Sequence, residues 1–211
     1  MEVWFFHWRG PPTGGPRVIV GVYMFRVAIF IDGGYMDKVL RNEFGGVKIS
    51  YDRLACEIAY LIRPDLDVLR TYYYHCLPYK GHPPTRKESK RFGAMQSFLE
   101  SLDRLPRFEV REGRLARRGP DEQGRYHFEQ KMVDVLLSVD LVRLSTGGQV
   151  SHAALVAGDS DFVPAVQAAR NAGVSVWLFH GEYYHNELWK LADERIRINP
   201  KLVEKVRWVG R

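Results

Sequence analysis

Cysteine is scarce in this sequence, and long apolar runs are absent. Its 211 residues include two cysteines, Cys56 and Cys76, which lack metal-binding spacing and are too few to cross-link a domain of this size. We therefore expect a reducing, cytoplasmic environment. The longest apolar runs have about six to eight residues, whereas a membrane-spanning helix needs roughly 20, so no membrane partner is expected.

The composition also lacks the bias of a disordered or fibrous protein. Hydrophobic residues make up 45% of the chain and charged residues 27%, which is ordinary for one globular domain with a full core. The formal net charge is +6 at pH 7. A basic balance suits a partner that bears phosphates, but it can also simply keep a protein in solution.

The first 24 residues resemble nothing that follows them. Glycines and prolines interrupt this segment, and it lacks the continuous apolar centre of a signal peptide. A second methionine, Met24, stands directly before the first regular pattern. We interpret residues 1–24 as a loosely attached, disordered N-terminal extension that follows from a start codon assigned too early. The alternative is an apolar arm, packed on the domain or on a partner, built from Trp4, Phe5, Phe6 and Trp8.

After this segment, apolar runs alternate with stretches of helical period. Short runs rich in β-branched residues are typical of buried strands, and apolar residues three or four apart are typical of amphipathic helices. Strands are predicted at 26–31, 67–77, 107–118, 124–131, 152–157 and 174–179, and helices at 35–44, 50–62, 87–105, 131–144 and 161–173. This alternation predicts a three-layer α/β fold with a central, mainly parallel sheet that is covered on both faces.

Aspartates follow two of the predicted strands at the point where each strand ends. Asp32 comes directly after the first strand, and Asp159 and Asp161 come directly after the strand 152–157. In doubly wound sheets, ligands bind beyond the carboxyl ends of the strands, where the strand order reverses. If these two strands are neighbours, the three carboxylates meet at one crevice.

A fourth aspartate lies on the predicted helix 131–144. At about 100° per residue, Lys131 and Asp134 share one face of this helix, whereas Asp140 lies about 120° from Asp134. Asp140 is therefore expected on a solvated face beside Arg143. Carboxylates crowded at one crevice repel one another and partly protonate unless a cation is present. Hard oxygen ligands at that density suit Mg²⁺ or Mn²⁺.

Three of these four aspartates also have a purely structural explanation. Asp161 could cap the next helix, since that register places Pro164 at the third helical position, where a missing N–H matters little. Asp32 could be an ordinary turn residue, and Asp134 could lie on a solvated helix face. Asp159 has no such task. The coincidence of these positions at one predicted crevice favours a metal site.

Three segments together resemble a known family. The segments "VAIFIDGGYM", "KMVDVLLSVDLV" and "ALVAGDSDFVPAVQAARNAGVSVWLF" are similar to the NYN domain, of the LabA-like branch, within the PIN-like nuclease superfamily. The resemblance covers residues 25–198 and implies a Rossmann-like PIN fold and divalent-metal-dependent cleavage of RNA by an endoribonuclease. Residues 199–211 then form a basic C-terminal tail.

The resemblance also implies which residues form the catalytic site. Asp32 and Asp159 would be the main ligands of Mg²⁺ or Mn²⁺, with Asp134 and Asp161 completing the site directly or through water. Lys131 would hold a phosphate oxygen or orient Asp134. Metal-activated water would leave 5′-phosphate and 3′-hydroxyl ends. Related nucleases often have an asparagine shortly after the first acid, whereas this chain has "DGGY", which leaves the hydrogen bonds around Asp32 open.

Two cation-rich segments, 79–91 and 114–125, lie near polypeptide that should rim the crevice. Their phosphate contacts would give affinity without sequence preference, and we expect single-stranded RNA as the partner. The predicted RNA-binding residues are Arg86, Lys87, Lys90, Arg91, Arg114, Arg117, Arg118 and Arg125. Nearby tyrosines could stack on unpaired bases, although strand alternation predicts at least half of them in the core. They are Tyr72, Tyr73, Tyr74, Tyr79 and Tyr126.

Two other classes of function remain alternatives to the nuclease. The first is a non-catalytic RNA-binding or regulatory adaptor that keeps the fold and its acids. The second, more distant, is a glycosyltransferase that uses "DSD" to hold a metal and a nucleotide-sugar, and it calls for a larger acceptor-binding region than this chain offers. The sequence leaves a homodimer open.

Overall fold

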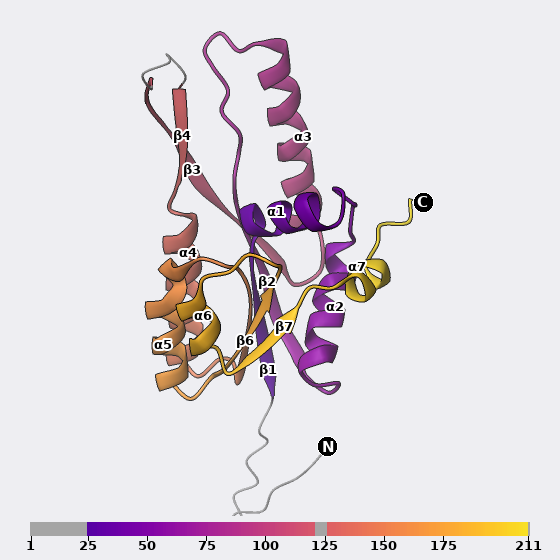
Figure 1. Ribbon diagram of the computed structural model, residues 1–211, viewed down its shortest axis with the longest axis vertical. Helices are drawn as coiled ribbons and strands as arrows, with labels where there is room; N and C mark the ends of the chain where they lie inside the picture. Colours follow the sequence, from indigo (N-terminus) through magenta and orange to yellow (C-terminus); the bar gives the residue numbers. More distant parts are fainter. Residues whose placement is uncertain (1–24, 121–125, 211) are drawn as a thin grey trace, which may run out of the picture.

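The computed structural model (Figure 1) describes residues 25–120 and 126–210, and their side chains except those of residues 115–120 and 126–131. The predicted extension, residues 1–24, therefore lies outside the described residues. The described strands form one sheet in the order β4-β3-β2-β1-β5-β6-β7. Their bounds are β1 Arg26–Asp32, β2 Asp67–Cys76, β3 Phe108–Pro120, β4 Tyr126–Lys131, β5 His152–Val156, β6 Ser175–His180 and β7 Glu194–Arg197.

Six strands, in the sheet order β3-β2-β1-β5-β6-β7, run parallel to one another. The remaining strand, β4, pairs antiparallel with the outer part of β3. The helices are α1 Gly33–Glu43, α2 Tyr51–Ile62, α3 Arg86–Asp103, α4 Val133–Thr146, α5 Val163–Asn171, α6 Asn186–Leu191 and α7 Pro200–Lys205, with a 3₁₀ turn, η1, at Ser160–Phe162. Helices α1, α2, α3 and α7 cover one face of the sheet, and α4, α5 and α6 cover the other. The predicted three-layer α/β fold is confirmed.

Strand β1 lies at the centre of both cores. Its residues 27–31 are all fully buried, because successive side chains of a strand point to opposite faces and both faces are covered. Val27, Ile29 and Ile31 pack under α1 and α2, and Ala28 and Phe30 pack under α4 and α5. The continuous apolar run in the sequence thus reflects a strand with no solvated face.

The three consecutive tyrosines of β2 are core residues. Tyr73 packs on the α1 and α2 side of the sheet, while Tyr72 and Tyr74 pack on the α4 side. Tyr72 stacks on Phe30 with ring centroids 5.6 Å apart, and Tyr73 meets Tyr51 edge-on at 5.2 Å. These three rings are therefore not available to stack on RNA bases, as strand alternation predicts for most of the group.

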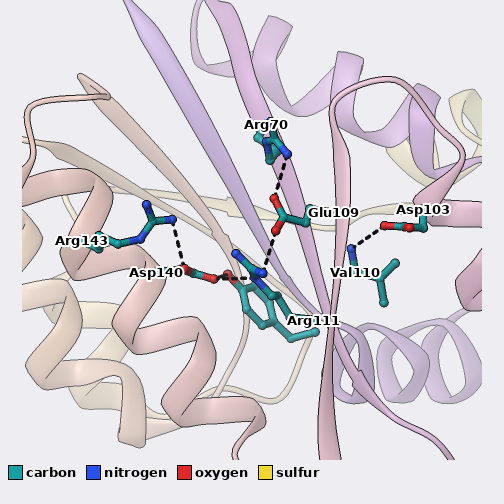
Figure 2. Close-up of polar contacts among 8 residues, drawn as sticks. Arg70, Asp103, Glu109, Val110, Arg111, Asp140 and Arg143 are labelled. Atoms are coloured by element: carbon teal, nitrogen blue, oxygen red, sulfur yellow. Dashed lines mark hydrogen bonds and ion pairs between the residues drawn. The ribbon is translucent and has the colours of Figure 1, made fainter.

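Asp140 is buried in the middle of α4, and the prediction of a solvated face is wrong. Its side chain accepts hydrogen bonds from the Tyr74 hydroxyl at 3.1 Å, from Arg111 Nε at 3.1 Å and from Arg143 Nη2 at 3.3 Å. Figure 2 shows how Glu109, 2.7 Å from Arg111, extends this cluster along β3. A buried carboxylate needs such partners, and they tie α4 to β2 and β3.

The chain does not end in a simple basic tail. Within the segment 199–211, α7 begins with the side chain of Asn199 as its cap, and Leu202, Val203 and Val206 are buried in the core. A helix of six residues is too short to show a clear apolar period, so this helix could not be predicted from the sequence pattern. None of the helices in the described ranges combines the length and apolar character that crossing a bilayer requires.

Candidate functional site

A cleft of about 1030 Å³ opens at the carboxyl ends of β1, β2 and β5. Strands β1 and β5 are neighbours, and the chain leaves β1 toward β2 on one side and adds β5 on the other, which makes this the point where the strand order reverses. The cleft is lined by three of the four predicted aspartates, which come from separate elements: Asp32, Asp134 and Asp159. Asp161 is not among its lining residues.

Asp32 ends β1 and caps α1. Its Oδ1 accepts a hydrogen bond from the backbone N–H of Tyr35 at 3.0 Å. Asp32 therefore acts as a helix cap and also lines the cleft. Burial raises the pKa of Asp32, and the nearby charge of Asp134 adds to this, while the hydrogen bond from Tyr35 opposes it. The surroundings of Asp32 therefore disfavour the charged form of its carboxylate.

Asp134 is the aspartate that is coupled to the other three. It lies in the first turn of α4, where the helix dipole favours a negative charge. Burial raises the pKa of Asp134, and the charges of Asp159 and Asp161 raise it further. Asp32 is coupled to Asp134 as well. These electrostatic effects indicate that the four carboxylates lie close enough together to repel one another.

The structure gives the capping role to Asp159, where the sequence predicted it for Asp161. The side chain of Asp159 caps η1 and accepts from the backbone N–H of Asp161 at 3.2 Å. Helix α5 begins only at Val163, with Pro164 in its first turn, so Asp161 does not cap it. The prediction that Asp161 caps the helix is wrong because Asp161 lies inside η1, between β5 and α5. The prediction assumed that the helix follows the strand directly.

Lys131 is not on the helix that carries Asp134. It is the last residue of β4, where it pairs with Arg114 of β3, and Met132, with φ of 75°, separates it from α4. The shared helix face is thus wrong because α4 begins at Val133, two residues later than predicted. The side chain of Lys131 lies outside the described residues, so its role stays a prediction.

Sequence reasoning missed a polar stripe on α1 that forms a wall of the cleft. Tyr35, Lys38, Arg41 and Asn42 all line it. The charge of Lys38 lowers the pKa of both Asp32 and Asp134, although burial outweighs it. The sequence pattern could have shown this stripe, because the spacing of three and four residues places these side chains on one face of the helix that Asp32 caps.

A buried histidine forms part of the cleft as well. His75, at the end of β2, has Nδ1 2.7 Å from the carbonyl oxygen of Cys76 and Nε2 3.3 Å from Oδ2 of Asp37. Burial alone would lower the pKa of His75, but the hydrogen bonds to Asp37 and Cys76 outweigh it, so the pKa is raised. The negative charge of Asp32 contributes to the raised pKa of His75, so the two side chains are near each other, and the alternating pattern of β2 did not indicate this.

The predicted RNA-binding residues are distributed over two projecting parts of the molecule. In Figure 1, α3 and the strands β3 and β4 project from the same end of the molecule as α1. Arg91 lines the cleft, and Arg86, Lys87 and Lys90 are exposed beside it on α3. Arg114 is exposed on β3. Three others have side chains outside the described residues: Arg117, Arg118 and Arg125.

The oxygen donors of the aspartates are of the type that binds Mg²⁺ or Mn²⁺, although their side chains are not arranged as a complete coordination site. As the side chains stand, no group of three or more His, Cys, Asp or Glu residues in the described part of the chain is arranged to hold a metal ion. The donors are hard carboxylate oxygens, which these ions prefer. Burial, and then mutual repulsion, raises the pKa of Asp32 and Asp134, and a cation would offset the cost of holding these charges. The residue types therefore fit such an ion.

Comparison with known proteins gives one family. The family model of the NYN domain matches residues 26–199. Among solved structures, MurG from Acinetobacter baumannii is similar at 14% identity and a TM-score of 0.39, covering 83% of this chain. This chain spans 42% of that protein, and a likeness this weak supports no functional argument. No curated protein matches the chain significantly.

Proposed function

Because this chain belongs to the NYN domain family, whose members are generally nucleases, we propose that it is a divalent-metal-dependent endoribonuclease of the LabA-like branch. One observation carries the proposal. Carboxylates from three separate elements, Asp32, Asp134 and Asp159, line one cleft at the switch point of the sheet. Burial there raises the pKa of Asp32 and Asp134, and mutual repulsion raises it further. Such an arrangement is costly without a cation.

In this proposal Asp32, Asp134 and Asp159 bind Mg²⁺ or Mn²⁺, and Asp161 acts from outside the cleft through water. When bound, the ion would supply a water molecule of lowered pKa as the nucleophile and would stabilise charge on the phosphate. The residues of the chain hold the substrate: Lys38 lies close enough to lower the pKa of two of the aspartates and is suited to a phosphate oxygen. Lys131 would share that task or orient Asp134.

The substrate is single-stranded RNA, and the products carry 5′-phosphate and 3′-hydroxyl ends. Cations that line or flank the cleft, such as Lys38, Arg41 and Arg91, complement a phosphate backbone whatever its sequence. The chain has two cysteines, Cys56 and Cys76, too few to cross-link a domain of this size, in keeping with the cytoplasm that we propose as the site of action. A homodimer remains part of the proposal to be tested.

Cleavage assays with and without metal test this function. Purified protein should cut a labelled single-stranded RNA of about 20 nucleotides when Mg²⁺ or Mn²⁺ is present, and EDTA should stop the reaction. The 3′-hydroxyl ends should accept extension by a poly(A) polymerase. Cleavage that continues in EDTA would contradict a metal-dependent mechanism, and tight binding without any cleavage would favour the adaptor.

The cations of α3 should contribute to RNA binding without sequence preference. Replacing Arg86, Lys87, Lys90 and Arg91 together with alanine should weaken binding to every RNA sequence tested. It should also reduce the slope of log Kobs against log[salt] by up to about 3, because each lost phosphate contact on a single strand removes roughly 0.7 of slope. Fluorescence anisotropy between 50 and 300 mM KCl, in EDTA, measures both effects.

A matched control uses cations that do not line the cleft. Arg53 on α2 and Lys201 on α7 are both exposed, so their replacement with alanine changes the net charge of the protein without removing a proposed phosphate contact. The slope should then stay at the wild-type value. If the α3 variant also keeps the wild-type slope, RNA binds on another surface.

A further inference from the structure

The loop 181–185, between β6 and α6, carries an exposed tyrosine on the wall of the cleft. Tyr183 is 71% exposed, although it lines the same cleft as Asp32 and Asp159. In the part of the chain that the structure describes, no aromatic ring packs against Tyr183. Its neighbour Tyr184 differs, because it packs edge-on against His180 with ring centroids 4.5 Å apart.

Hydrogen bonds fix the backbone of this loop. The Tyr35 hydroxyl donates to the carbonyl oxygen of Tyr183 at 2.8 Å and accepts from the N–H of Gly181 at 2.9 Å. The N–H of His185 donates to the carbonyl oxygen of Gly158 at 2.8 Å. Tyr183 is thus held on a fixed loop, although its ring is exposed.

The same anchors connect the loop to the turns that carry the aspartates. Tyr35 donates its backbone N–H to Asp32, and Gly158 directly precedes Asp159. Gly158 also lies against the Tyr35 ring: a Cβ at this position would be 2.3 Å from Tyr35 Cε2 and 3.0 Å from the Tyr183 carbonyl oxygen. The position of Tyr183 relative to both aspartates is therefore set by direct contacts.

We propose that Tyr183 is a stacking platform for one unpaired base of single-stranded nucleic acid, held beside the aspartates. This inference rests on the proposed nuclease function and adds to it a subsite and a requirement for an unpaired base. The same cleft presents Lys38, Arg41 and Arg91, and cations along a backbone path combined with an exposed aromatic ring are the usual elements of single-strand binding. A base paired within a duplex could not reach the ring.

The subsite is tested by binding in EDTA, where cleavage cannot occur. The probe is a 5′-fluorescein RNA of ten nucleotides, together with ten versions that each lack one base. For wild type, loss of the base at one position should weaken binding about 5- to 150-fold, the range expected for stacking of one base on an aromatic ring. Tyr183→Ala should weaken binding to the intact RNA by a similar factor, and Tyr183→Phe should not.

The decisive comparison is a thermodynamic cycle between Tyr183 and that base. In Tyr183→Ala, loss of the base at the sensitive position should cost nothing further, because the two changes remove the same contact. Tyr60, on α2 and 60% exposed, is the matched control, and Tyr60→Ala should bind every RNA as wild type does. Since both side chains are exposed, both variants should melt at the wild-type temperature.

The possible failures are distinguishable. If Tyr183→Ala keeps the wild-type sensitivity to the same base, or if wild type binds and cuts RNA with no single sensitive position, the stacking platform is wrong and the nuclease stands. Binding of duplex RNA as tight as that of single-stranded RNA also overturns the platform. If wild type neither binds nor cuts RNA, the proposed function falls, and Tyr183 is better explained as part of a protein interface.

Discussion

Asp134→Asn is expected to abolish RNA cleavage and leave the fold intact. Asparagine keeps the shape of the side chain but removes the charge of the carboxylate that is coupled to Asp32, Asp159 and Asp161. Changes to groups that merely support a metal ligand typically cost 10- to 100-fold, so loss of a ligand itself should lower the single-turnover rate by more than about 100-fold. The assay uses saturating RNA and 5 mM Mg²⁺.

The same variant should be more stable than wild type when no metal is present. Folding raises the pKa of Asp134 above its usual value of 3.8, so over the interval between the two values the folded state binds more protons than the unfolded state. The free energy of unfolding therefore falls as pH rises through this interval. In EDTA, Asp134→Asn should melt above wild type at pH 7, and the difference should shrink as the pH approaches 4.

Asp161→Asn is the matched control, because it makes the same change in charge at a residue that does not line the cleft. It should reduce cleavage less than Asp134→Asn does. Mg²⁺ or Mn²⁺ should raise the melting temperature of wild type and of Asp161→Asn by binding only the folded state, and should raise that of Asp134→Asn much less. Full activity and full stabilisation by metal in Asp134→Asn would remove the aspartate cluster as the proposed site.

The sequence was sufficient to predict the layers of the fold and the place of the cleft. The run 26–31 is apolar at every position, which only a strand covered on both faces tolerates. Parallel strands align their carboxyl ends, so acids that directly follow such runs had to gather at one edge of the sheet. That reasoning brought Asp32 and Asp159 to one cleft without any information on side-chain geometry.

Local details around the site could not be predicted in the same way. A 3₁₀ turn of three residues has too short a period to show in a sequence, so the capping role fell on Asp161 in the prediction and on Asp159 in the structure. The position of Lys131 relative to Asp134 depended on where α4 begins, and the boundary of a helix leaves little signal in the apolar pattern. The partnership of His75 with Asp37 joins residues 38 apart in the sequence, and only the folded sheet brings them together.

Gly33→Ala is expected to destabilise the protein and disable the cleft together. A Cβ on Gly33 would lie 2.6 Å from Cζ and Oη of Tyr73 and 2.7 Å from Cδ2 of His75. Tyr73 is fully buried and cannot move aside, so the start of α1 must shift instead. Overpacking of this kind costs about 1–3 kcal/mol, which for a chain of this size lowers Tm by about 2–12 °C. The shift would also displace Asp32, the preceding residue, and cleavage should fall with it.

Gly93→Ala separates this clash from the general effect of replacing a glycine by alanine. Gly93 lies inside α3, where a Cβ would meet nothing within 4 Å. Alanine is favoured over glycine in a helix interior by about 0.5–1 kcal/mol, so Gly93→Ala should raise Tm slightly and cut RNA at the wild-type rate. The melting temperatures of the two variants should therefore move in opposite directions from wild type, and only Gly33→Ala should cleave RNA more slowly. If Gly33→Ala melts and cleaves as wild type does, α1 does not need its close approach to Tyr73 to hold Asp32 in the cleft.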